Sequence, residues 1–194
     1  MTDPANATIR PARRQFFRSA GQATLSATAV ALLAGCAGAM GDDKGPGMAA
    51  RPSDIAILNS ALEGEHNAIA AYQVGAESGL LQQPVLALAV QFQGHHKRHV
   101  DALTRTVRKL GGTPTEAKAR YDFPVAGLKT QADVLAFAAG LEKEAVSAYL
   151  EAVPQFADSA LAKAAASILG DEAMHWAVLR QALGQDPVPV AFMS

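Results

Sequence analysis

The sequence predicts an all-α protein, a four-helix bundle built from two repeated helical hairpins and a long crossover. Three observations lead to this class. Four long segments carry apolar residues at helical spacing, no useful stretch alternates as a strand would, and the two halves of the chain repeat. Two short hairpins joined by one long connection are typical of one form of the four-helix bundle.

The first hairpin is expected to contain helices over about residues 53–79 and 84–111. Ser53 and Asp54 suit an N-cap, because their side-chain oxygens accept hydrogen bonds from the free backbone N–H groups of a first turn. Pro84 is favoured near the start of a helix, and the glycine pair after residue 110 is typical of a helix end.

The second hairpin follows a long connection, residues 111–130, which contains two prolines and three glycines. The third helix is expected over about residues 131–153, where Pro154 ends it. The fourth is expected over about residues 159–183, with Gly184 as its C-terminal cap. The predicted bundle domain spans residues 53–184, and residues 185–194 form a C-terminal tail.

The repeat between the halves includes ionisable residues. The stretch "EHNAIAAY" at 65–72 aligns with "EKEAVSAY" at 142–149, an offset of 77 residues. The stretch "GHHKRHVDAL" at 94–103 aligns with "GDEAMHWAVL" at 170–179, an offset of 76 residues. Alanine-rich helices often look alike, but ionisable residues matched at a nearly constant offset favour a true repeat of one helical hairpin.

Residues 1–35 have the pattern of a signal peptide: a positive segment, a moderately apolar segment and small residues at a cleavage zone. The apolar run is too short and too rich in alanine, serine and threonine for a stable membrane span. Arg13 and Arg14, followed by Gln-Phe-Phe, resemble the bacterial twin-arginine signal, which exports folded proteins. The alternative is an ordinary secretory signal with a chance arginine pair.

Cys36, the only cysteine, ends the sequence Leu-Ala-Gly-Cys, which resembles the lipobox of bacterial lipoproteins. Acylation there would anchor an exported, periplasmic or cell-envelope protein to a membrane, with residues 36–52 as a flexible tether rich in glycine and proline. The alternative is cleavage after Ala39, with the cysteine discarded. The expected partners are therefore the membrane and the twin-arginine export machinery.

Composition excludes some other classes. The 194-residue chain is 49% hydrophobic with a formal net charge of -1, whereas a nucleic-acid protein normally has a basic excess on one face. The basic stretch "HHKRH" at 95–99 is the one feature that suggests nucleic-acid or heparin binding. On an exported protein we interpret it as a mixed helix face with two inward histidines, and we expect no nucleic-acid partner.

Polar residues on the predicted inward faces are the candidate functional site. Glu65 and Glu142 each lie two helical turns before a tyrosine, and Glu172 and His175 are adjacent at i and i+3. Carboxylate and imidazole groups on facing helices suit iron, manganese or zinc. The alternative is that they are ordinary core polar groups. The tyrosines, Tyr72 and Tyr149, are either redox-active neighbours of a metal or core residues with one hydrogen bond each.

The stretches "LNSALEGEHNAIAAY" and "GHHKRHVDAL" resemble the ferritin-like superfamily, especially its exported bacterial members, and the resemblance covers about residues 53–184. The resemblance implies a ferritin-like bundle with a metal pair at its centre, iron before manganese or zinc. By position, it implies that Glu65 and Glu142 are terminal carboxylate ligands and that Glu172 is a bridging carboxylate. The imidazole ligands would be His99 and His175.

One position departs from the pattern. Where the repeat requires a second bridging glutamate, the chain has His96, which brings one lone pair and removes one negative charge. This change favours a single metal, an asymmetric pair, a zinc site or an empty site over a symmetric pair of iron ions. A one-residue shift would turn His95 inward instead. Three further acids are candidate substitutes, although each is expected on a solvated face: Glu63, Glu144 and Asp171.

Two functions remain open from the sequence. The first is a metal-dependent oxidoreductase of the envelope that oxidises Fe(II) or detoxifies peroxide. The second is a non-enzymatic envelope lipoprotein, a stress or scaffolding module with a degenerate metal site, which the departure at His96 supports. A histidine phosphotransfer bundle conflicts with the export signal, and a homodimer is left open as the assembly.

Overall fold

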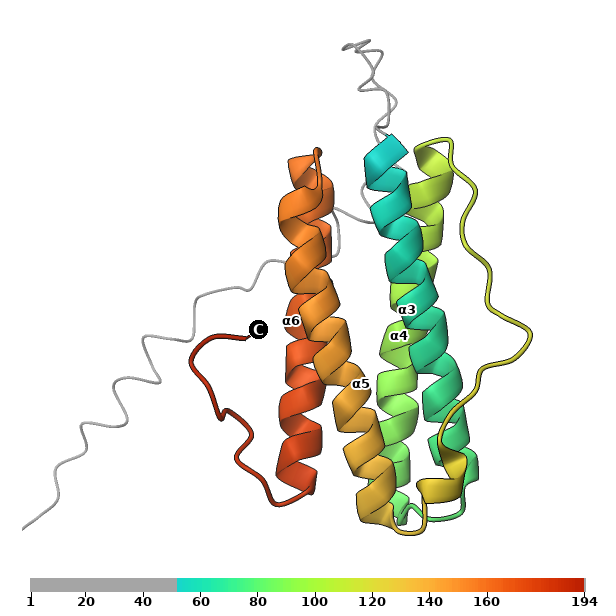
Figure 1. Ribbon diagram of the computed structural model, residues 1–194, viewed down its shortest axis with the longest axis vertical. Coiled ribbons are helices and arrows are strands. Elements are labelled where there is room, and N and C mark those ends of the chain that lie inside the picture. The colour runs from blue at the N-terminus through green and yellow to red at the C-terminus, as the bar shows by residue number, and fades with distance from the viewer. Residues whose placement is uncertain (1–51, 194) are drawn as a thin grey trace, which may run out of the picture. The chain divides into compact units, whose positions relative to one another are not determined.

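The computed structural model describes residues 52–193 (Figure 1). It contains four long helices, α3 (Pro52–Glu77), α4 (Gln83–Lys109), α5 (Gln131–Ala152) and α6 (Ser159–Ala182). Two short 3-10 helices, η2 (Val125–Gly127) and η3 (Val153–Gln155), lie in the connections, and the described residues contain no strand. The prediction of an all-α four-helix bundle is confirmed. The calls on the signal peptide and lipid anchor lie outside the described residues, namely those on residues 1–35, Arg13, Arg14 and Cys36.

The helices form two hairpins, because α3 packs along α4 and α5 packs along α6, while α3 and α5 also meet. The crossover between the hairpins runs along the outside of the bundle (Figure 1). Asn59 of α3 holds it in place. Its Nδ2 donates to the carbonyl of Thr113 at 3.0 Å, and its Oδ1 accepts from the backbone N–H of Thr115 at 2.8 Å.

The second hairpin begins and ends at well-defined caps. Thr130 and Asp133 form a capping box, in which each side chain accepts from the other residue's backbone N–H. Asp158 caps α6 by accepting from the N–H of Ala160 at 2.7 Å. Gly184 follows the last turn of α6 with a φ of +71°, which glycine adopts without steric cost.

The expected N-cap of the first helix is wrong, because α3 already begins at Pro52 and so includes Ser53 and Asp54. Asp54 has a different role. Its side chain is buried, and its Oδ1 accepts a hydrogen bond from the backbone N–H of Ala157 at 2.8 Å. The carboxylate therefore ties the start of α3 to the turn between α5 and α6.

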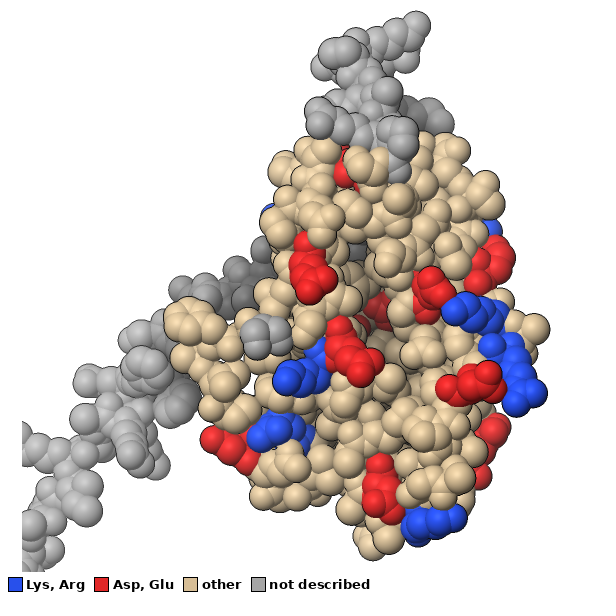
Figure 2. Space-filling model, viewed as in Figure 1, with Lys and Arg blue, Asp and Glu red and all other residues tan. Residues whose placement is uncertain are grey.

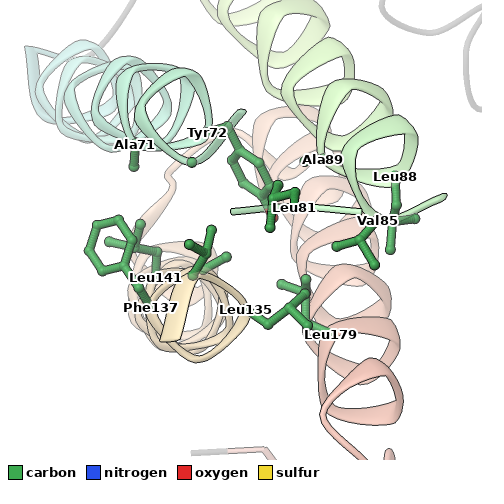
Figure 3. Close-up of a pocket in the computed structure, with 13 residues that line it drawn as sticks. Ala71, Tyr72, Leu81, Val85, Leu88, Ala89, Leu135, Phe137, Leu141 and Leu179 are labelled. Atoms are coloured by element: carbon green, nitrogen blue, oxygen red, sulfur yellow. The ribbon is translucent and has the colours of Figure 1, made fainter. Parts of the chain in front are cut away.

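Two apolar clusters make up the core. One contains Leu58, Leu62, Leu103, Val107, Tyr149, Ala165 and Ile168. The other contains Tyr72, Phe92, Leu135, Ala139, Trp176 and Leu179. In the second cluster, side chains from all four helices surround an apolar cavity of about 20 Å³, which is about the space one water molecule needs (Figure 3). None of the helices within residues 52–193 has both the length and the apolar character of a membrane span.

Candidate metal centre

The structure brings together all six residues predicted as metal ligands, and every one of the four helices contributes. Five of them are at most 3% exposed, which is rare for ionisable side chains unless they are paired or bind a metal. They are Glu65 of α3, His96 of α4, Glu142 of α5, and Glu172 and His175 of α6. The sixth, His99 of α4, has a side chain that is 14% exposed.

Four of these residues form a first group of ligand atoms, all within 4.8 Å of one another: Glu65, His96, His99 and Glu172. Nδ1 of His99 lies 3.3 Å from Oε2 of Glu65 and 3.1 Å from Oε1 of Glu172. Nδ1 of His96 lies 2.9 Å from the same Glu65 oxygen. Two carboxylates and two imidazoles at this spacing fit one transition-metal ion.

The second group contains His96, Glu142, Glu172 and His175, with the same spacing limit. Nδ1 of His175 lies 3.2 Å from Oε2 of Glu172 and 3.5 Å from Oε1 of Glu142. Nε2 of His96 lies 3.4 Å from that Glu142 oxygen. This donor set has the same composition as the first, so the two halves of the chain supply matched sites.

Glu172 belongs to both groups and points one oxygen at each. Its Oε1 lies beside His99 and its Oε2 beside His175. Oε1 is buried, and no well-oriented hydrogen bond from the described residues reaches it, although Nδ1 of His99 lies 3.1 Å away. A buried carboxylate oxygen without a donor is costly, and a bound cation would satisfy it. These residues therefore fit a metal, and Glu172 has the geometry of a bridging ligand.

His96 is the other shared residue. It is turned fully inward, so the alternative in which His95 takes its place is wrong. Its Nδ1 faces Glu65 and its Nε2 faces Glu142, which the sequence did not predict. A neutral imidazole has one lone pair, so with a metal present one nitrogen would bind the ion while the other would donate its proton to the opposite glutamate. The two halves of the centre are therefore chemically unequal.

The two buried tyrosines act across the bundle. Tyr72 of α3 donates its hydroxyl proton to Oε1 of Glu142 on α5. Tyr149 of α5 donates to Oε1 of Glu65 on α3 at 2.7 Å. Burial and the neighbouring carboxylates raise the pKa of both tyrosines, so both hydroxyls keep their protons. Each tyrosine thus holds the terminal glutamate of the other half.

The carboxylates and imidazoles stabilise one another's charges. Burial alone would raise the pKa of Glu65, but hydrogen bonds from His96 and His99 outweigh it and lower the pKa to about 2. Burial would lower the pKa of His96, but the bonds to Glu142 and Glu65 raise it to about 11. The pKa values of His99 and His175 rise to about 9 in the same way. The buried carboxylates therefore hold protons on the three histidines, and a metal cation that binds here would take the place of those protons.

The remaining acids that the sequence offered as substitutes divide into two kinds. Glu63 and Glu144 are exposed, as expected, and Glu63 pairs with Lys118. Asp171 is not simply solvated: its Oδ2 lies 3.2 to 3.4 Å from ring nitrogens of three histidines, His95, His99 and His175. The available signal was its position four residues before His175, which places both on one helix face.

A cleft of about 510 Å³ between α3 and α5 reaches this centre from one face of the bundle. Small residues such as Gly64, Ala68 and Ala145 line its walls, and Glu65 and Glu142 lie in its lining with His96. Figure 2 shows this face, where acidic side chains border a hollow between the two helices. Small molecules from solvent can therefore approach the carboxylates.

The comparisons with known proteins agree with this fold. A family model described as a ferritin-like domain matches residues 53–185. A comparison with curated protein sequences finds no match. Among solved structures, a conserved hypothetical protein from Mycobacterium tuberculosis is similar at 25% identity and a TM-score of 0.63, covering 72% of this chain and 96% of its own.

Two further solved structures share the fold. One is described as ferritin-like, diiron-carboxylate proteins from Bacillus anthracis, with 24% identity, a TM-score of 0.59 and coverage of 67% of this chain and 94% of that one. The other is a dodecameric thioferritin, a bacterioferritin-related protein from Bacteroides fragilis. It has 23% identity and a TM-score of 0.59, and covers 68% of this chain and 84% of its own.

Proposed function

Because the chain belongs to the ferritin-like domain family, we propose that it is an envelope metal protein that oxidises Fe(II) with oxygen or peroxide at the bundle centre. The observation that carries the proposal is the pair of four-ligand groups that share Glu172 and His96. The diiron-carboxylate description of the Bacillus anthracis structure supports iron as the metal, with manganese or zinc as alternatives.

The residues of the chain have separate roles in this proposal. Glu65 with His99 would hold one ion, Glu142 with His175 would hold the other, and Glu172 would join them. Iron bound there supplies one-electron redox chemistry. Two Fe(II) substrate ions give one electron each to one hydrogen peroxide molecule, which takes up two protons and becomes two water molecules.

The cleft between α3 and α5 supports the proposal, since a small oxidant needs a route to buried carboxylates. The tyrosines keep Glu65 and Glu142 in place while ions bind and leave. Export and anchoring are part of the proposal and rest on Arg13, Arg14 and Cys36. Twin-arginine export carries folded proteins, so the centre could be filled before transport.

The test is iron binding and oxidation by the purified full-length chain. Wild-type protein should bind Fe(II) without oxygen and convert it to Fe(III) on addition of peroxide. Glu142→Gln should lower the oxidation rate at least about tenfold. Replacing a residue that only hydrogen-bonds to a metal ligand already lowers activity by about ten- to a hundredfold, and Glu142 is itself a proposed ligand. Glu77→Gln is the matched control, because Glu77 is an exposed glutamate at the end of α3 and does not line the cleft.

Two results would decide against the proposal. Wild-type protein that binds no metal under iron- and zinc-replete conditions would favour the non-enzymatic envelope module. Equal oxidation by wild type and Glu142→Gln would place the chemistry elsewhere. His175→Gln serves as a second variant in case Glu142→Gln unfolds, and thermal unfolding curves show whether each variant is folded.

A further inference from the structure

Beside the buried centre, a third group of metal-ligand side chains lies between α4 and α6 and shares His175 with the centre. It contains His95, Asp171 and His175. The side chains of His95 and Asp171 are 22% and 25% exposed, whereas that of His175 is 2% exposed. The cluster therefore lies between solvent and the buried centre.

The three ligand atoms form a compact triangle. Nδ1 of His95 lies 2.9 Å from Nε2 of His175 and 3.2 Å from Oδ2 of Asp171, and the third edge is 3.4 Å. Metal–nitrogen bonds of about 2.0–2.1 Å place neighbouring ligand atoms about 2.8–3.0 Å apart in octahedral sites and about 3.3–3.4 Å apart in tetrahedral sites. Two imidazoles and one carboxylate on one face, with the other positions open, are a set that suits divalent first-row metals.

We infer that His95, Asp171 and His175 form a solvent-facing site that captures a divalent transition-metal ion and passes it to the buried centre. This loading role rests on the proposed function of that centre. His175 links the two sites, because its Nε2 faces the triangle while its Nδ1 faces Glu172. One neutral imidazole offers one lone pair, so the outer ion gives up His175 when the inner ion takes it.

The ring of His175 is held in the plane that both sites need. Phe92 of α4 stacks on it with ring centroids 4.1 Å apart and an angle of 24°. Oδ2 of Asp171 also lies 3.3 Å from Nε2 of His99, whose Nδ1 faces Glu65 and Glu172 in the centre. When Nδ1 of His99 and Nδ1 of His175 bind inner ions, the protonated Nε2 of each ring would donate to Asp171. The carboxylate would then no longer be free to hold an outer ion.

The experiment uses Co(II), whose visible absorption reports coordination, added without oxygen to the full-length chain. His95→Ala should fill the buried centre at least about tenfold more slowly than wild type, at unchanged final occupancy, because His95 contacts none of the buried carboxylates. His66→Ala is the matched control, since His66 contacts the carbonyl of Thr115 in the crossover instead. His95→Gln is a second variant that keeps more of the side-chain volume.

A variant at Glu172, the ligand shared by the two buried groups, separates this inference from the proposed function. Glu172→Gln should keep one Co(II) ion at the outer site, and the double variant Glu172→Gln with His95→Ala should lose it. Equal loading rates for His95→Ala and wild type, or no ion on Glu172→Gln, would overturn the outer site while leaving the buried centre standing. A wild type that binds no Co(II) would overturn both.

Discussion

Replacing Tyr149 with phenylalanine removes one hydroxyl group and little else, so it measures what the crossed tyrosine–glutamate bonds contribute. The lost bond, 2.7 Å long and fully buried, joins the hydroxyl to the Glu65 carboxylate, whose pKa is lowered to about 2. Hydrogen bonds to charged groups contribute about 1.5–3 kcal/mol. For a chain of this size each kcal/mol shifts the melting temperature by about 2–4 °C. We expect Tyr149→Phe to melt about 3–12 °C below wild type.

The same reasoning predicts a similar loss for Tyr72→Phe, because Tyr72 donates to Glu142 in the matching position. Tyr121→Phe is the control: it is the chain's third tyrosine, and its hydroxyl accepts an exposed bond from the backbone N–H of Lys118. Thermal unfolding of the metal-free proteins by circular dichroism provides the measurement. Losses for Tyr72→Phe and Tyr149→Phe no larger than that for Tyr121→Phe would refute the structural role of the crossed bonds.

Three other predictions concern the core, the pH dependence and the export signal. Leu62→Ala, at a fully buried position, should lower the free energy of unfolding by about 2–5 kcal/mol in urea titrations. The pKa of His96 is raised to about 11, so a metal must displace a proton, and Co(II) affinity should rise between pH 6.5 and 8.5; a flat profile would contradict this. Cell fractionation should find Arg13→Lys with Arg14→Lys retained in the cytoplasm and Cys36→Ala released from the membrane. Unchanged fractions would contradict the export and anchor proposals.

The helices and the buried ligands could be predicted because they depend on local pattern and on the repeat. Helical spacing marks the apolar faces, and the offset of the halves places Glu142 where Glu65 lies in the first half. Because the inward face of each helix is known, the polar residues on those faces are expected to meet inside the bundle. The repeat of the two hairpins therefore predicts that ligand side chains from all four helices lie together.

Contacts that depend on the distance between helices could not be predicted in this way. Tyr72 shares a helix face with Glu65, yet its hydroxyl bonds Glu142 on another helix. The two nitrogens of His96 divide between glutamates of α3 and α5 because its ring lies between those helices. Asp54 could be mistaken for a cap because the turn that it holds comes about a hundred residues later.

The most direct measurement is the anomalous X-ray scattering of crystals soaked in Fe(II) without oxygen, collected at the iron edge. The proposed metal centre requires iron bonded to Glu172 in the bundle interior, on the side of Glu65 and His99, on the side of Glu142 and His175, or on both. Iron found only on the protein surface, or an interior without an anomalous peak under saturating Fe(II), would contradict it.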